Sequence, residues 1–209
     1  MGITPQHLVR FGDQYLFPGN VRYPEQTATL SATPGPSLSM RFGMVAIADP
    51  WYPEGSPEYP AIALGQGEKG TVLTTFARTR AGSDTHEPMA VAAVVGDLDQ
   101  VVTWQPVVQD EQHFHLDVDS ALGAFYEITD AAVVQPLFED ALYMKGIYDR
   151  ALTELMVAME VGGRVVAVVF LCPDGSGLYP VWAGFDRDMT AVAVLVDLKL
   201  LEGAVQRTG

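Results

Sequence analysis

The chain has 209 residues, of which 12 are Lys or Arg and 26 are Asp or Glu, giving a formal net charge of −14. Such a surface repels phosphate backbones and anionic membranes, which argues against nucleic-acid binding and membrane docking. A chain of this length buries roughly 70% of its unfolded surface, so a single domain over 1–209 needs no disulfide or structural metal. The acidic surface is interpreted first as an aid to solubility and second as a docking face for a basic partner.

The single cysteine and the N-terminal sequence indicate the cellular compartment in which the protein is expected. Cys172 ends an apolar run and is expected to be a buried small hydrophobe rather than a nucleophile. No cationic segment followed by an apolar one opens the sequence, and no apolar run approaches the roughly 20 residues of a membrane-spanning helix. We therefore expect a cytoplasmic protein with no membrane partner. Abundant Ala and Val beside three lysines suggest a GC-rich bacterial genome.

The first 118 residues predict a series of short strands. Residues 1–39 carry five prolines and are interpreted as an irregular segment packed on the domain, with short strands at 14–17 and 27–30 and turns at 31–39. The strand predicted at 101–108 contains Pro106, which has no N–H to donate, so this strand is expected at a sheet edge. Further strands are predicted at 40–48, 61–64, 71–80, 89–95, 101–108 and 113–118, with loops at 51–60, 65–70, 81–88, 96–100 and 110–112.

One helical region follows these strands. Asp130 is placed to cap a helix from Ala131, and Pro136 either lies in the first turn of a second helix or kinks a single one. Apolar residues at helical spacing extend from Phe138 to Met159, and Gly162-Gly163 ends the region with a tight turn.

The C-terminal part predicts a three-strand antiparallel meander. Within 165–198, the apolar runs VVAVVFL, LYPVWAGFD and AVAVLVDL are separated by the turn clusters CPDGSG and RDMT. Together with the earlier strands, this pattern predicts a β-rich α+β domain of antiparallel sheets. The sheets would form a sandwich or an open barrel, with one late helical segment.

The densest run of potential ligands is His113-x-His115-x-Asp117-x-Asp119. On a strand, these four side chains share one face and the three apolar residues between them share the other. Two imidazoles two residues apart can share a metal ion that a carboxylate completes, and Asp174 across a groove would add a second carboxylate. The simpler interpretation is a half-exposed strand with its polar residues outward, so we predict no metal and no cofactor.

The turn at 174–177 and the aromatic residues give weaker signals. The sequence Asp-Gly-Ser-Gly lacks a lysine and a following helix, so it indicates a hairpin connection rather than a phosphate-binding loop. At least one of its two glycines is expected to have a positive φ. Trp51, Tyr179 and Trp182 flank loops near strand starts, where aromatic residues either line a pocket or interface or plug the ends of a β core.

Three segments resemble a bacterial domain-of-unknown-function family with a Gly-Asp-Gly motif. The family pattern is a strand ending in Asp-Pro, then Asp-x-Gly-x-Gly-x-Phe, then Gly-Asp-Gly-x-Tyr-Pro-Val-x-x-Gly-Tyr-Asp before a final apolar strand. Residues 43–50 (GMVAIADP), 119–125 (DSALGAF) and 175–186 (GSGLYPVWAGFD), followed by 191–198, match it here.

Two positions depart from that pattern, because Ser176 replaces the middle Asp and Ala121 replaces a Gly. A catalytic motif would lose its carboxylate at Ser176, whereas a turn would keep its shape, since Ser and Asp both favour tight turns. The resemblance implies a fold and no reaction. The motif positions and the aromatic residues together supply the candidate binding residues Asp49, Trp51, Ser176, Tyr179, Trp182 and Asp186.

Two functions of different class are left open. The first is a non-enzymatic binding or protein-interaction domain that docks a partner, for which a basic protein is the natural candidate. The second is a metal- or carboxylate-dependent hydrolase-like enzyme that uses the 113–119 strand and Asp174. Homo-oligomer formation is compatible with either function.

Overall fold

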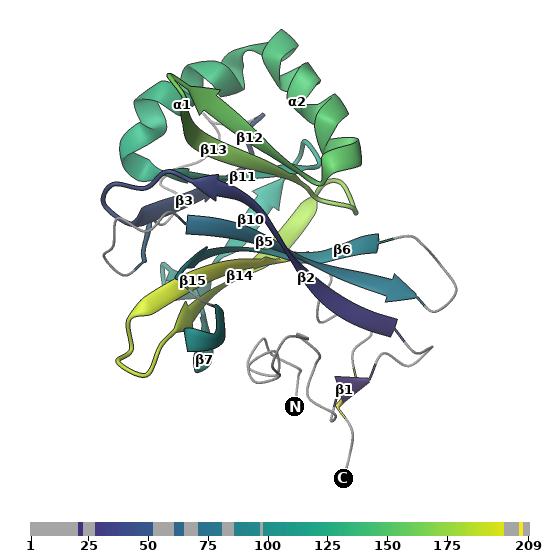
Figure 1. The fold of residues 1–209 in the computed structure, drawn as a ribbon, viewed down its shortest axis with the longest axis vertical. Helices are drawn as coiled ribbons and strands as arrows, with labels where there is room; N and C mark the ends of the chain where they lie inside the picture. Colours follow the sequence, from purple (N-terminus) through teal and green to yellow (C-terminus); the bar gives the residue numbers. More distant parts are fainter. Residues whose placement is uncertain are drawn as a thin grey trace.

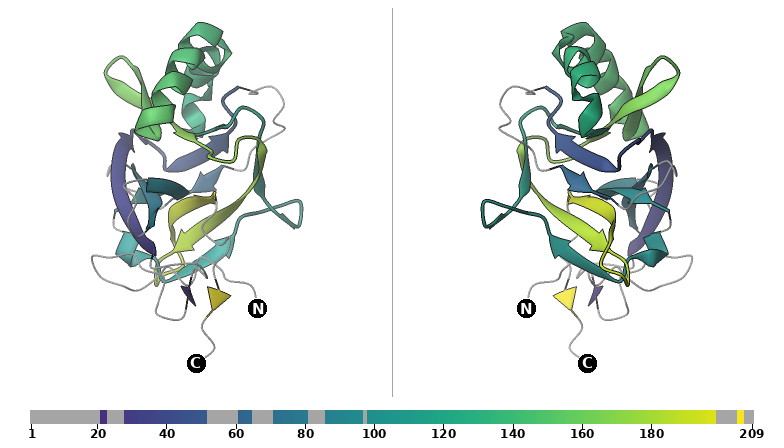
Figure 2. Two further views of the ribbon diagram at one scale, coloured as in Figure 1. Left: turned by 90° about the vertical axis from the view of Figure 1, so that its right-hand side faces the viewer. Right: turned by 90° about the vertical axis from the view of Figure 1, so that its left-hand side faces the viewer.

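The computed structural model describes residues 21–22, 28–51, 61–64, 71–80, 86–96, 98–198 and 205–206. The strand predicted at 14–17 and most of the loops predicted at 51–60, 65–70 and 81–88 lie outside these residues. Two antiparallel sheets face each other, and two helices cover the outer face of the smaller sheet (Figure 1). The side views in Figure 2 place both helices at the same end of the molecule. The predicted β-rich α+β class is confirmed.

The larger sheet has seven strands among the described residues, in the order β10-β14-β15-β6-β5-β2, with β7 also paired to β14. Because β14 is the one described partner of β7, Pro106 at the end of β7 lies at an edge, as predicted. The strands are β2 (Ala28–Leu38), β5 (Thr71–Arg80), β6 (His86–Val95), β7 (Thr103–Pro106), β10 (His115–Val118), β14 (Gly177–Phe185) and β15 (Ala191–Asp197).

The smaller sheet has five described strands in the order β12-β13-β11-β3-β4. They are β3 (Met44–Ala48), β4 (Ile62–Ala63), β11 (Leu122–Glu127), β12 (Met156–Val161) and β13 (Arg164–Leu171). Two short antiparallel pairs lie apart from the sheets: β1 (Val21–Arg22) with β16 (Val205–Gln206), and β8 (Val108–Gln109) with β9 (Gln112–His113).

The helical region forms two helices, α1 (Ala131–Glu139) and α2 (Ala141–Glu154). A 3-10 turn at Ile128–Asp130 precedes them, and another lies at Leu98–Gln100. The predicted cap is wrong, because the Asp130 side chain accepts no hydrogen bond from the first turn of α1 and instead pairs with Arg164. Asp140 caps α2, and its carboxylate accepts from the backbone N–H groups of the second and third helical residues.

Pro136 lies inside α1, and the break between the helices comes at Asp140. The predicted helical series from Phe138 to Met159 is wrong only at its end, because α2 ends at Glu154 and residues 156–161 form β12. Leu142 and Leu152, which belonged to that series, are exposed. The buried face of α2 is instead made by Met144, Ile147 and Ala151.

The N-terminal strands differ from prediction in their bounds. Residues 31–38, predicted as turns, belong to β2, which passes through Pro34 and Pro36 with a register shift between Pro34 and Ser37. This is physically consistent because β2 is an edge strand, where a residue without an N–H is tolerated. Four residues predicted as strand, 40–43, are a loop, and β6 begins three residues before its predicted start.

The C-terminal meander is present with one difference in its pairing. β14 and β15 pair as neighbours, while β13 pairs with β11 and β12 in the smaller sheet. Residues 172–176 therefore cross from one sheet to the other instead of closing a hairpin. The Gly162-Gly163 turn does close a hairpin, between β12 and β13, and both glycines have positive φ.

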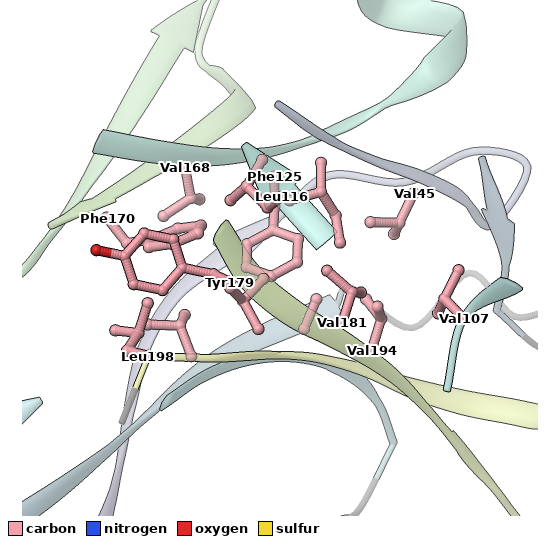
Figure 3. Packing of buried hydrophobic residues seen from close by; sticks show 14 of the residues in the cluster. Val45, Val107, Leu116, Phe125, Val168, Phe170, Tyr179, Val181, Val194 and Leu198 are labelled. Carbon is pink, nitrogen blue, oxygen red and sulfur yellow. The ribbon is translucent and has the colours of Figure 1, made fainter. Parts of the chain in front are cut away.

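The main core lies between the sheets and receives side chains from both, so the described strands share one hydrophobic interior (Figure 3). Among its members, Phe125 and Phe170 come from the smaller sheet and Leu116, Tyr179 and Val181 from the larger. A second cluster fills the space between the helices and the smaller sheet, where Phe138, Met144 and Ile147 pack on β11, β12 and β13.

Candidate functional site

The three motif segments converge at one end of the β10–β14 pair. Asp49 follows β3, the second segment follows β10, and the third leads into β14. The backbone N–H of Cys172 donates to the carbonyl of Ala121 at 2.9 Å, which ties the crossing between the sheets to the second segment. In the β10–β14 register, Asp117 lies opposite Leu178 and Val118 opposite Gly177.

Asp49 is a buried carboxylate whose hydrogen bonds all serve the fold. One oxygen, Oδ2, accepts from the backbone N–H groups of Asp119 and Ser120 at 2.7 and 2.9 Å. The other oxygen, Oδ1, accepts from the Ser120 hydroxyl at 2.6 Å and from the Trp51 N–H at 2.8 Å. Four donors on two oxygens satisfy this group, so it acts as a clamp between β3 and the loop after β10.

In the second motif segment, residues 119–125, the small residues Ala121 and Gly123 are explained by backbone conformation and by packing. Ala121 has a φ of +63°, in the left-handed region that favours glycine. A Cβ on Gly123 would lie 2.2 Å from the Phe170 ring. That ring also lies 5.2 Å from the ring of Phe125, measured between centroids. These positions therefore shape the core and offer no chemistry.

The crossing turn is closed by Tyr179. Its hydroxyl donates to the carbonyl of Gly175 at 2.9 Å, and Gly175 has a φ of +78°, which confirms the predicted positive-φ glycine. Asp174 and Ser176 are exposed on the turn. Burial raises the pKa of the Tyr179 phenol, with Cys172 and Asp174 adding to the effect. Ser176 therefore occupies a turn position in which no carboxylate is needed for closure.

Cys172 is buried, as predicted, with 1% of its surface exposed. Burial raises the pKa of its thiol, and the nearby Asp49 carboxylate raises it further. A thiol held protonated is a poor nucleophile and a poor metal ligand.

Within the predicted ligand segment, buried apolar and exposed acidic side chains alternate as expected from Leu116 to Asp119. Leu116 and Val118 point into the core, while Asp117 and Asp119 are exposed. His115 is partly buried at the start of β10. Among the described residues, no group of three or more His, Cys, Asp or Glu side chains is arranged to hold a metal ion.

His113 ends β9 and His115 begins β10, so the two residues belong to two short strands and not to the single strand predicted at 113–118, yet their rings lie side by side. Their ring centroids are 4.7 Å apart, and the His113 ring packs at 4.9 Å against the edge of Trp182. Nε2 of His113 lies 2.9 Å from the carbonyl oxygen of Val181, and Nδ1 of His115 lies 2.8 Å from that of His113. A carbonyl oxygen can only accept, so both of these nitrogens donate.

The candidate binding residues do not form one site. Asp49, Trp51, Ser176 and Tyr179 lie near the crossing turn, whereas Trp182 lies farther along β14, and Asp186 follows the other end of that strand. The Asp186 carboxylate accepts from the N–H groups of Asp188 and Thr190 and so closes the β14–β15 turn.

A second buried clamp was missed by sequence reasoning. Glu127 is fully buried at the end of β11, and its carboxylate accepts from the backbone N–H groups of Arg41, Phe42 and Gly43. This arrangement fixes the loop between β2 and β3. A Glu ending a strand is not by itself a recognisable signal, because its partners lie more than 80 residues earlier in the chain.

The fold and its clamps thus define a two-sheet α+β domain whose motif residues build the structure. No family model matches the chain, and no curated protein or solved structure is significantly similar to it. Within the described residues, no helix is both long and apolar enough to cross a membrane.

Proposed function

We propose that this protein is a non-enzymatic binding domain that docks a basic protein partner. The observation that supports this proposal is that the polar side chains of the motif, Asp49, Ser120, Tyr179 and Asp186, all make hydrogen bonds within the fold. A catalytic carboxylate or hydroxyl needs a lone pair or proton directed at a substrate, and these groups have theirs directed at backbone and side-chain partners. Membership of the Gly-Asp-Gly family is proposed with it, on the same three segments.

The docking surface that fits best is the exposed end of the β10–β14 pair, here called the carboxylate edge and comprising Asp117, Asp119, Asp174, Leu178 and Trp51. The three carboxylates are exposed. Leu178 and Trp51 are 65% and 41% exposed and provide apolar contacts among them. Exposed apolar side chains beside exposed carboxylates are suited to a protein-interaction surface, and a net charge of −14 attracts a basic partner from a distance.

Zero-length carbodiimide cross-linking in cells that express the protein tests this proposal, because the reagent joins carboxylates to lysine amines. We expect one saturable basic partner, cross-linked through Asp117, Asp119 or Asp174, and no cross-link when the reagent is instead added to a lysate at about 0.5 M salt, where charges on the surface are screened. The absence of any saturable partner would overturn the docking function.

A matched pair of variants tests the surface. The triple variant Asp117→Asn, Asp119→Asn, Asp174→Asn should lose the partner. The control variant Glu139→Gln, Glu160→Gln, Asp188→Asn removes the same number of exposed charges elsewhere and should keep it. Equal binding by both variants would place the partner on another face.

The hydrolase-like enzyme is the weaker candidate. A metal-dependent enzyme needs several ligands around one ion, and within the described residues no group of three or more His, Cys, Asp or Glu side chains is arranged to hold one.

A further inference from the structure

The imidazoles of His113 and His115 lie side by side, with their ring centroids 4.7 Å apart. Each ring donates one N–H to a backbone carbonyl, at Val181 and at His113 itself. These bonds fix the tautomers and leave Nδ1 of His113 and Nε2 of His115 as the nitrogens with a lone pair. A metal-binding histidine is commonly held in this way, with its second ring nitrogen donating to a carbonyl.

The ring separation also fits a shared ion. A metal ion about 2.0–2.1 Å from an imidazole nitrogen lies about 3.2 Å from that ring's centroid, so two rings meeting at about 90–110° have centroids about 4.5–5.2 Å apart. The His113 and His115 centroids are 4.7 Å apart, with the ring planes inclined by 49°. Both side chains are partly exposed, so an ion in solution can reach them.

We propose that His113 and His115 chelate one divalent late first-row transition-metal ion through Nδ1 and Nε2 respectively. Imidazole suits copper, nickel and zinc, and the usual order of affinity makes Cu²⁺ the tightest. Because the described residues offer no third His, Cys, Asp or Glu in this group, water completes the coordination. The site is independent of the carboxylate edge and of the docking function.

Trp182 supplies a direct signal for this site, because its ring lies 4.9 Å from that of His113 and bound Cu²⁺ quenches a nearby indole. CuCl₂ is titrated into tag-free protein in a non-chelating buffer, with tryptophan fluorescence and calorimetry followed together. We expect saturable one-to-one binding that is at least tenfold weaker in His115→Ala and in His115→Gln. In Trp182→Phe, the calorimetric binding should persist while most of the quenching is lost.

His86→Ala is the matched control, since His86 lies on β6 outside the pair, and it should bind as the native chain does. Far-ultraviolet circular dichroism shows whether each variant is folded. If His115→Ala does not fold, His115→Gln is used in its place. Native-like affinity in a folded His115 variant, or loss of binding in His86→Ala, would overturn the proposal. ZnCl₂ followed by calorimetry should give the same ranking of variants at lower affinity.

Discussion

Asp49 and Ser120 are 71 residues apart in the chain, and the carboxylate of the first accepts both the hydroxyl and the backbone N–H of the second. This contact joins the end of a strand in the smaller sheet to the loop that leaves the larger one. It is a contact between the sheets made by polar groups rather than by the apolar core.

Breaking this clamp should destabilise the protein strongly. Asp49→Ala leaves three backbone N–H groups and a hydroxyl without their acceptor, and we expect a loss of about 2–4 kcal/mol in the free energy of unfolding. Ser120→Ala removes one of these bonds and should cost about 1 kcal/mol. Urea denaturation measures both. Asp119→Asn, which changes an exposed side chain, should stay within about 0.5 kcal/mol, and an equally small effect of Asp49→Ala would contradict the clamp.

Ala121→Gly should stabilise the protein. At a φ of +63°, an alanine is strained by about 1–2 kcal/mol, which exceeds the extra backbone entropy that a glycine loses on folding. The expected gain is about 0.5–1 kcal/mol, seen as a higher denaturation midpoint. The same substitution at Ala124, buried within β11, should destabilise. A loss of stability in Ala121→Gly would show that the loop does not hold this conformation.

The two glycines of the crossing turn should respond differently to alanine. Gly175 has a φ of +78° and open space around it, so Gly175→Ala is expected to cost about 1–2 kcal/mol through backbone strain alone. Gly177 has no left-handed φ, and a Cβ there would meet the Tyr179 ring at an ordinary 3.8 Å, so Gly177→Ala should change stability by less than about 0.5 kcal/mol. Thermal melts of the two variants make the comparison. The reverse ranking would refute the assigned turn.

Stability should fall at alkaline pH because of Cys172. Burial raises the pKa of this thiol in the folded protein, whereas a thiol in the unfolded chain titrates near about 8.5. The contribution of the buried Cys172 thiol to the free energy of unfolding is therefore fully present below about pH 8.5. It is lost as the pH rises above this value, because the unfolded state then releases a proton that the folded state keeps. Urea denaturation should show a loss of up to about 2 kcal/mol between pH 8.5 and 10.

The control for this pH effect is Cys172→Ala, which removes the titrating group. Its stability should be lower at pH 7, because a buried side chain has been shortened, but it should vary less with pH over the same range. An identical pH profile in the two proteins would exclude the thiol as the cause.

The strands predicted correctly are those whose local pattern matches their environment. β5 was predicted to its exact bounds because its sequence alternates and glycines precede and follow it in the sequence, and β14 and β15 follow from long apolar β-branched runs. β11 was missed because Gly123 and Ala124 weaken its strand signal. What favours a strand there is the Phe170 ring, which fills the space that a side chain at 123 would take.

The end of the helical region was missed for a different reason. Met156 and Met159 continue the apolar spacing of a helix, yet α2 stops where Leu155 adopts a φ of +62°. Tertiary pairing of β12 with β13 overrides the local pattern there. The clamps made by Asp49 and Glu127 could not be predicted either, because a single sequence contains no sign of which backbone segment a distant carboxylate will meet.

The pairing of early strands with late ones has a consequence for biosynthesis. β3 pairs with β11, and β6 pairs with β15. These two early strands can therefore complete their pairing only after β11 and β15 have left the ribosome. A nascent chain that ends before residue 191 still lacks the neighbour of β6, and its alanine- and valine-rich strand presents an unpaired edge. Completion of the larger sheet therefore depends on β15, and chaperone binding to the nascent chain should fall sharply once β15 is available to pair with β6.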